Sequence, residues 1–255
     1  MGREQAAVAL SVKGLKKNYG GLAATRDVDL EIAAGHVHAI IGPNGAGKTT
    51  LLSLLSGALA ADAGEVHLFG QPMHGHAEQA RVAAGLVRSF QITSVFDELS
   101  VLDNLQVAVQ RGQHRSYGFF HASASDRAAR EAAMTVARRV GLEKVVHQLS
   151  SQLSQGARRR LDVGLAIACG PRVLLMDEPM AGMGHEESGD MIALIQSLKE
   201  ELTVVLVEHD MEAVFALADR MTVLVQGAVL ATGSVEEIRA NAEVKLAYLG
   251  EEETQ

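Results

Sequence analysis

Hydrophobic and polar residues alternate with a period of two in several segments of the first ninety residues, which is typical of half-buried strands. The alternation is clear in residues 10–12, 28–32 and 65–70, the last of which ends at a glycine turn. Residues 36–41 are mostly apolar and predict a short buried strand, and residues 50–55 predict the opening of a helix. We therefore expect strands on either side of a strand–loop–helix unit.

The pattern becomes helical between residues 100 and 150. Ser100 is the expected N-cap of one helix, and Ser125-Asp126 precede an alanine-rich helix that should end near Gly141. Residues 112–123 between them predict a loop. Because no flexible linker bounds this stretch, we interpret it as a helical insertion within one domain.

Helices and strands alternate again after Ser154. Residues 173–176 and 203–207 are uninterrupted apolar runs, as expected of strands buried in a parallel sheet. Residues 221–225 and 228–230 flank Gln226-Gly227 and predict a hairpin. The chain as a whole therefore predicts an α/β protein.

The composition narrows the class of protein. The 255 residues suffice for one large domain, and without an apolar run of about 18 residues or a secretory signal we expect no membrane span and no export. The single cysteine, Cys169, lies in an apolar helical run and is expected to fill the core. The net charge of −8 argues against a general nucleic-acid binder.

Charge is unevenly distributed along the chain. Residues 81–172 carry 13 basic and 7 acidic side chains, whereas residues 173–255 carry 4 and 17. The basic middle third could face phosphates, a membrane surface or an acidic partner, or could simply form solvated helical faces.

The loop after residues 36–41 contains the pattern G-x-x-x-x-G-K-T, which is typical of phosphate-binding loops. Glycines let backbone N–H groups turn inward around a phosphate chain, and the following helix N-terminus adds its dipole. Lys48 supplies a positive charge for the β- and γ-phosphates, and the Thr49 hydroxyl can bind Mg²⁺. The residues expected to contact the nucleotide here are Gly42, Pro43, Asn44, Gly45, Ala46, Gly47, Lys48, Thr49 and Thr50.

Two consecutive buried strands end in polar residues. Asp177 follows residues 173–176 and suits a Mg²⁺ contact, while Glu178 can orient or deprotonate the water that attacks a γ-phosphate. His209 closes the next strand in the same way. Because both strands should end beside the phosphate-binding loop, we expect a catalytic role for His209 as well.

These motifs, in this order, resemble the ATP-binding subunits of ABC transporters over nearly the whole chain. The resemblance implies that Asp177 is the Walker B aspartate, Glu178 the catalytic glutamate and His209 the switch histidine. The further residues implied are Tyr19, which stacks on adenine, Gln91, the Q-loop glutamine near Mg²⁺ and the attacking water, and Ser154 and Gly156, which contact phosphate from the signature motif at 153–157.

The resemblance also implies a fold. It has a P-loop NTPase core with a mainly parallel sheet, an N-terminal antiparallel β subdomain and a helical insertion subdomain. One domain then covers residues 1–255, with the β subdomain and P-loop core in 1–90, the helical insertion and signature in 91–160, and the rest of the core in 161–255.

Three positions depart from the family pattern. The signature matches LSGGQ at three of five positions, with Gln155 in place of glycine and Ala157 in place of glutamine. Gly184 stands where the D-loop usually has aspartate. In this family two subunits face each other head to tail, so that each signature serves the partner's nucleotide. The weakened signature therefore predicts a second, non-identical ATPase subunit with a signature nearer LSGGQ.

Finer features resemble the branched-chain amino-acid importers, and among them the longer of their two ATPase subunits. Such a subunit uses ATP and Mg²⁺, binds transmembrane permease subunits, serves a solute-binding protein indirectly, and sits at the cytoplasmic face of the inner membrane without binding nucleic acid. The features are Ser89-Phe90-Gln91, residues 97–105, Gly118-Phe119-Phe120, residues 158–161 and residues 247–251.

Other assignments remain open from the sequence. Urea or short-amide importers and the lipopolysaccharide-export ATPase share parts of the pattern. A soluble ABC ATPase acting on DNA or ribosomes, a P-loop GTPase or kinase, and an inactive regulatory ATP-binding subunit each explain fewer of the motifs.

Overall fold

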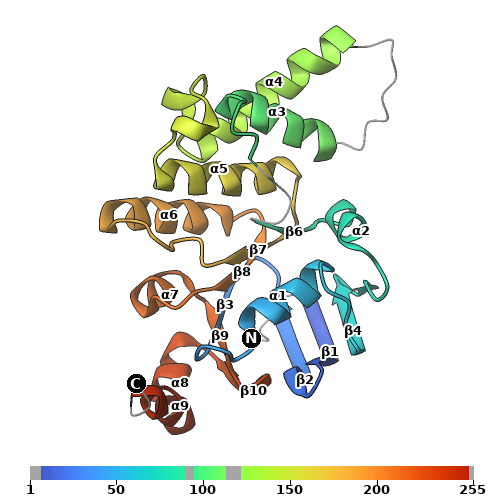
Figure 1. The fold of residues 1–255 in the computed structure, drawn as a ribbon, viewed down its shortest axis with the longest axis vertical. Coiled ribbons are helices and arrows are strands. Elements are labelled where there is room, and N and C mark those ends of the chain that lie inside the picture. Colours follow the sequence, from blue (N-terminus) through green and yellow to red (C-terminus); the bar gives the residue numbers. More distant parts are fainter. Residues whose placement is uncertain (1–6, 90–94, 113–121, 253–255) are drawn as a thin grey trace, which may run out of the picture.

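The computed structural model describes residues 7–89, 95–112 and 122–252, which form two sheets and a set of helices (Figure 1). A four-stranded antiparallel sheet has the order β2-β1-β4-β5. A six-stranded sheet has the order β10-β9-β3-β8-β7-β6 and is parallel except for the β9–β10 pair. The α/β prediction, with its antiparallel N-terminal sheet, is confirmed.

The strands of the antiparallel sheet are β1 (Val8–Tyr19), β2 (Leu22–Ala33), β4 (Ala63–Leu68) and β5 (Gln71–Pro72). The strands of the larger sheet are β3 (Val37–Ile41), β6 (Leu86–Arg88), β7 (Val173–Asp177), β8 (Thr203–Val207), β9 (Arg220–Val225) and β10 (Ala228–Gly233). The apolar runs predicted from the sequence correspond to β3, β7 and β8. Strand β3 is buried along its whole length, because it has a strand on each side and core on both faces.

The helices cover this framework. They are α1 (Lys48–Ser56), α2 (Glu78–Ala83), α3 (Val101–Gly112), α4 (Ala122–Arg139), α5 (Gln155–Ala168), α6 (His185–Leu198), α7 (Met211–Leu217), α8 (Val235–Ala240) and α9 (Ala242–Glu252). Figure 1 shows α3 and α4 beyond α5, on the side away from the antiparallel sheet. None of the described helices has both the length and the apolar character that a membrane crossing needs.

Of the two predicted helix starts in the insertion, that of α3 is confirmed and that of α4 is not. The Ser100 hydroxyl accepts a hydrogen bond from the Asp103 N–H at 3.1 Å, which confirms Ser100 as a cap. The start of α4 was predicted wrongly, because the helix begins at Ala122 rather than after Ser125-Asp126. Ala122 and Ala124 favour helix, which fits the earlier start. Of the predicted loop at 112–123, residue 112 lies in α3 and residues 122 and 123 lie in α4, while residues 113–121 are outside the described residues.

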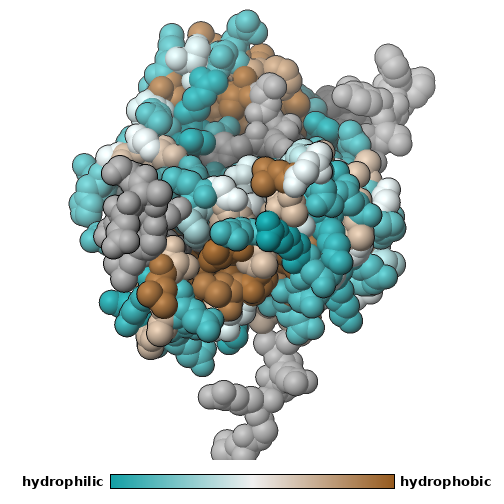
Figure 2. All heavy atoms as spheres, turned by 60° about the horizontal axis from the view of Figure 1, so that its bottom comes forward, coloured by the Kyte–Doolittle hydropathy of each residue, from teal (hydrophilic) through white to brown (hydrophobic). Residues whose placement is uncertain are grey.

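Three apolar clusters hold the elements together. One joins the insertion helices and α6 to the larger sheet and includes the buried Cys169, which confirms its expected role as a core residue. A second lies between the antiparallel sheet, α1 and the larger sheet, and a third lies under α7 and α8. Figure 2 shows the end of the molecule that is lowest in Figure 1, where a mostly hydrophilic surface surrounds an apolar area.

Candidate functional site

The loop between β3 and α1 has a backbone shape that requires glycine. Gly42, Gly45 and Gly47 have φ of 149°, 75° and 97°. A Cβ on Gly42 would lie 2.0 Å from the Leu224 carbonyl oxygen, and one on Gly47 would lie 2.3 Å from that of Ala24. Close backbone of neighbouring strands therefore excludes a side chain at positions 42 and 47, and the positive φ values favour glycine at all three positions, as the phosphate-binding pattern predicts.

Neighbouring backbone fixes this loop from outside. The Gly227 N–H, in the β9–β10 turn, donates to the Ala46 carbonyl at 3.0 Å, and the Arg26 N–H in β2 donates to the Gly227 carbonyl at 2.6 Å. The loop is thus joined to both sheets, which pre-organises its N–H groups before any ligand binds.

Lys48 and Thr49 open α1 at the loop. The Lys48 ammonium donates to the carbonyls of Gly42 at 2.6 Å and Pro43 at 3.0 Å, so it lies against the loop that it should serve. Thr49 is exposed in the first turn of α1, and its carbonyl accepts from the Ser53 hydroxyl at 2.8 Å. This arrangement offers backbone donors, a cation and a hydroxyl to one anionic ligand.

Asp177 is the last residue of β7 and Glu178 follows it, but their side chains differ in exposure. Asp177 is 17% exposed at its side chain, whereas Glu178 is 46% exposed. Glu178 has φ of 47°, a left-handed conformation that is unusual outside glycine, and its N–H donates to the Val207 carbonyl at 2.8 Å. The turn therefore separates the two carboxylates into a half-buried group and a solvent-facing one.

His209 lies beside Glu178 at the end of β8. Its Nδ1 is 3.8 Å from Glu178 Oε1, so the structure brings together two of the predicted catalytic residues. Gln91, the third, lies outside the described residues. The His209 ring is 66% exposed and can therefore approach a ligand in solvent.

Glu208 is a site residue that the sequence analysis missed. It is 1% exposed, and its carboxylate accepts from the N–H groups of Met180 at 3.0 Å and His209 at 3.1 Å. Burial raises the pKa of Glu208, and these backbone hydrogen bonds oppose the rise. The side chain ties the segments after β7 and β8 together, and the only sequence signal was its place directly after an apolar strand.

Arg88 is the second missed residue. Its guanidinium donates to Asp177 Oδ2 at 2.8 Å and to the Ser53 hydroxyl at 2.9 Å, with its side chain 7% exposed. Asp177 Oδ1 is buried with no hydrogen-bond partner among the described residues, which fits an oxygen ligand awaiting a cation. No group of three or more His, Cys, Asp or Glu within the described ranges could hold a metal by itself. A site with few protein ligands suits Mg²⁺ bound together with a nucleotide's phosphates.

The signature residues Ser154 and Gly156 both lie close to the carboxylate of Glu187 in α6. Ser154 caps α5 by accepting from the Ala157 N–H at 3.2 Å, and its hydroxyl is 3.5 Å from Glu187 Oε1. A Cβ on Gly156 would lie 2.3 Å from the same oxygen. Figure 1 shows α5, which Ser154 caps, apart from α1, which follows the phosphate-binding loop.

The departures from the family pattern lie near each other. The amide of Gln155 lies against Gly182, where a Cβ would be 2.3 Å from Nε2. Gly184 caps α6, and its N–H donates to Glu187 Oε2 at 3.4 Å. The unusual residues are thus accommodated by contacts between the signature and the segment after β7.

Tyr19 ends β1 beside the Gly20-Gly21 turn and is 52% exposed. An exposed ring at a strand end can stack on a base without rearrangement of the core.

We expect Tyr19→Phe to leave ATP binding nearly unchanged and Tyr19→Ala to weaken it by about 1 kcal/mol, measured by nucleotide titration. Equal losses in both variants would indicate a contact through the hydroxyl instead.

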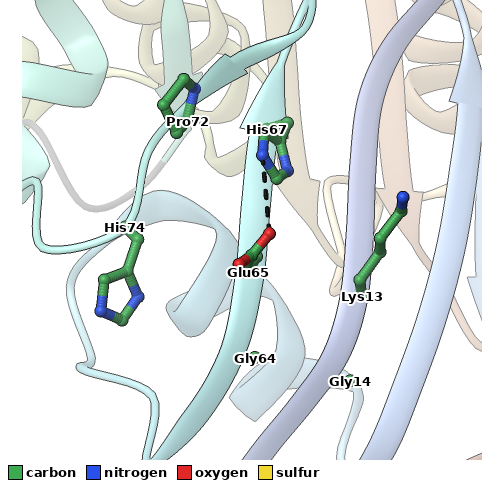
Figure 3. A pocket seen from close by; sticks show the side chains of 7 residues that line it. All are labelled: Lys13, Gly14, Gly64, Glu65, His67, Pro72 and His74. Atoms are coloured by element: carbon green, nitrogen blue, oxygen red, sulfur yellow. Dashed lines mark ion pairs between the residues drawn. The ribbon is translucent and has the colours of Figure 1, made fainter.

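A shallow cavity of about 640 Å³ lies on the antiparallel sheet rather than at the phosphate-binding loop (Figure 3). His67 lies 3.7 Å from Glu65 there, while His74 sits apart on the neighbouring loop. The lining residues are Lys13, Gly14, Gly64, Glu65, His67, Pro72 and His74. Without a third ligand near the histidines, this cavity offers no metal centre among the described residues.

Comparisons with known proteins agree with the geometry. A family model described as ABC transporter matches residues 25–181, and one described as branched-chain amino acid ATP-binding cassette transporter matches residues 228–254. The high-affinity branched-chain amino acid transport ATP-binding proteins BraF of Pseudomonas aeruginosa and LivG of Escherichia coli are each 38% identical, over 95% of this chain and 98% of their own length. The crystal structure of an ABC transporter's ATP-binding cassette in its ADP conformation has a TM-score of 0.82 at 25% identity, covering 95% of this chain and 99% of that one.

Proposed function

The chain belongs to the ABC transporter family of ATP-binding subunits, and we propose that it powers the import of branched-chain amino acids through a membrane transporter. The observation that carries this proposal is that the matches to branched-chain transport proteins extend over 95% of the chain and include the C-terminal segment 228–254. The nucleotide chemistry rests on the phosphate-binding loop, in which Gly42 and Gly47 have no room for a side chain.

Phosphate binding, metal binding and activation of water fall to different residues in the proposed ATP hydrolysis. The loop and first helical turn at residues 42–50 supply the backbone N–H groups of every residue but Pro43, together with the Lys48 ammonium and the Thr49 hydroxyl, to the phosphates. Thr49 and Asp177, together with Gln91 as the family resemblance implies, would hold Mg²⁺, and the ion would neutralise charge on the β- and γ-phosphates. Glu178 orients or deprotonates the attacking water. The His209 ring donates a hydrogen bond to the γ-phosphate.

We also propose how the subunit assembles. A head-to-tail dimer places Ser154 and Gly156 of one subunit against the nucleotide of the other, and the separation of α5 from α1 in Figure 1 supports this arrangement. Because Gln155 and Ala157 weaken this signature, the partner is a non-identical ATPase subunit. Transmembrane permease subunits bind the dimer at the cytoplasmic face of the inner membrane, and a solute-binding protein acts from the other side; nucleic acid has no part.

Purification of the complete transporter tests the proposal. We expect native mass measurement to find this chain with one different ATPase subunit and permease subunits, and branched-chain amino acids with their binding protein to stimulate ATP hydrolysis. Stimulation of ATP hydrolysis by urea or short amides instead would identify a different imported solute. Stimulation by lipopolysaccharide would indicate that the protein belongs to an exporter rather than an importer. Two copies of this chain without a second ATPase would overturn the heterodimer.

A further inference from the structure

Arg88 joins β7 and α1, the two elements that carry the proposed magnesium ligands Asp177 and Thr49. Its guanidinium contacts Asp177 at the end of β7 and Ser53 in α1, and the Ser53 hydroxyl in turn donates to the Thr49 carbonyl. These three contacts measure 2.8, 2.9 and 2.8 Å. A continuous path of hydrogen bonds therefore runs from Asp177 to Thr49, and it passes through one buried side chain.

The geometry points to Arg88 as a positioning residue for the magnesium ligands Asp177 and Thr49, an inference that rests on the proposed function. Arg88 holds one oxygen of Asp177, Oδ2, and leaves Oδ1 without a hydrogen-bond partner among the described residues. A carboxylate fixed by one oxygen presents the other in a defined direction. Partners of this kind behind a metal ligand commonly change metal affinity by roughly 10–100-fold when removed.

The planar guanidinium suits this task better than an ammonium would. Arg88 uses Nη1 for Ser53 and Nη2 for Asp177, so two fixed donors of one group set the spacing between α1 and β7. Lysine would keep the positive charge but place one compact donor between two acceptors. Substitution by lysine thus separates the effect of charge from the effect of geometry.

Arg81 provides a matched control. It is as buried as Arg88, at 6% exposure, and it also contacts α1. Its Nη1 donates to the carbonyls of Leu54 at 2.8 Å and Leu55 at 2.6 Å, at the end of the helix opposite Thr49. Changing Arg81 should therefore disturb α1 without touching a magnesium ligand.

The experiment measures binding of a fluorescent ATP analogue to the full chain, first in EDTA and then during titration with Mg²⁺. For Arg88→Met we expect nearly wild-type affinity in EDTA and a Mg²⁺ half-saturation raised by roughly 10–100-fold. Arg88→Lys, which keeps the charge but loses the fixed pair of donors, should raise the Mg²⁺ half-saturation by less than Arg88→Met does. Arg81→Lys should lower the melting temperature and leave the half-saturation unchanged, and Mn²⁺ binding followed by electron paramagnetic resonance gives a second readout.

Each outcome decides something. If Arg88→Met does not fold, Arg88→Lys and Ser53→Ala carry the test, and wild-type half-saturation in both would overturn the inference. Equal loss of affinity in EDTA and in Mg²⁺ would make Arg88 a general structural residue and would also overturn it. Failure of the wild-type chain to bind the analogue, or binding that survives Lys48→Ala, would instead count against the proposed nucleotide site.

Discussion

Glu178→Gln is expected to bind ATP as tightly as the wild-type chain and to turn it over at least about a hundredfold more slowly. The glutamine keeps the size of the side chain but loses the carboxylate that orients or deprotonates water. Glu178 is 46% exposed and lies 3.8 Å from His209, so its carboxylate is open to a water molecule from solvent. A hundredfold loss corresponds to about 2.7 kcal/mol of transition-state stabilisation.

The measurement pairs steady-state ATPase activity of the assembled transporter with nucleotide titration. Slow hydrolysis should also prolong the ATP-bound dimer, which gel filtration with ATP can detect. Glu186→Gln is a suitable control, because Glu186 is an exposed acid in the first turn of α6 and has no assigned catalytic role. Wild-type turnover in Glu178→Gln would show that another group activates the water.

Lys48→Ala is expected to abolish most turnover, while Ser154→Ala in the same chain should leave one of the two sites working. In the proposed heterodimer, the site formed by Lys48 and Glu178 uses the partner's better signature and should be the faster one. Loss of a preorganised phosphate contact commonly costs about 10²–10³ in rate. Ser154 serves the opposite site, which is already weakened by Gln155 and Ala157.

Single-turnover measurements on the purified transporter can separate the two sites. Lys48→Ala should remove the fast phase, and Ser154→Ala should remove mainly the slow phase. Ser188→Ala offers a control, because Ser188 lies in α6 and has no role assigned to it in either proposed site. Equal effects of Lys48→Ala and Ser154→Ala on both phases would be the result expected of two equivalent sites, and would contradict this division.

The sequence predicted the parts of the molecule that local pattern controls. Residues 203–207 matched β8 in full, and the glycine loop lay between a strand and a helix as expected. Arg88 and Glu208 were missed because their importance comes from contacts with residues distant along the chain. Arg88 meets Asp177 across 89 residues and Glu208 meets Met180 across 28, and no periodicity signals such pairs.

The place of β3 in the larger sheet has a consequence for synthesis of the chain on the ribosome. The strand that leads into the phosphate-binding loop ends at Ile41, but both of its neighbours, β8 and β9, begin after residue 200. At about 5–20 residues per second, the strand waits roughly ten to thirty seconds for them. During that time its apolar residues lack their sheet partners, so a nascent chain is exposed to aggregation longest at the segment on which ATP binding depends.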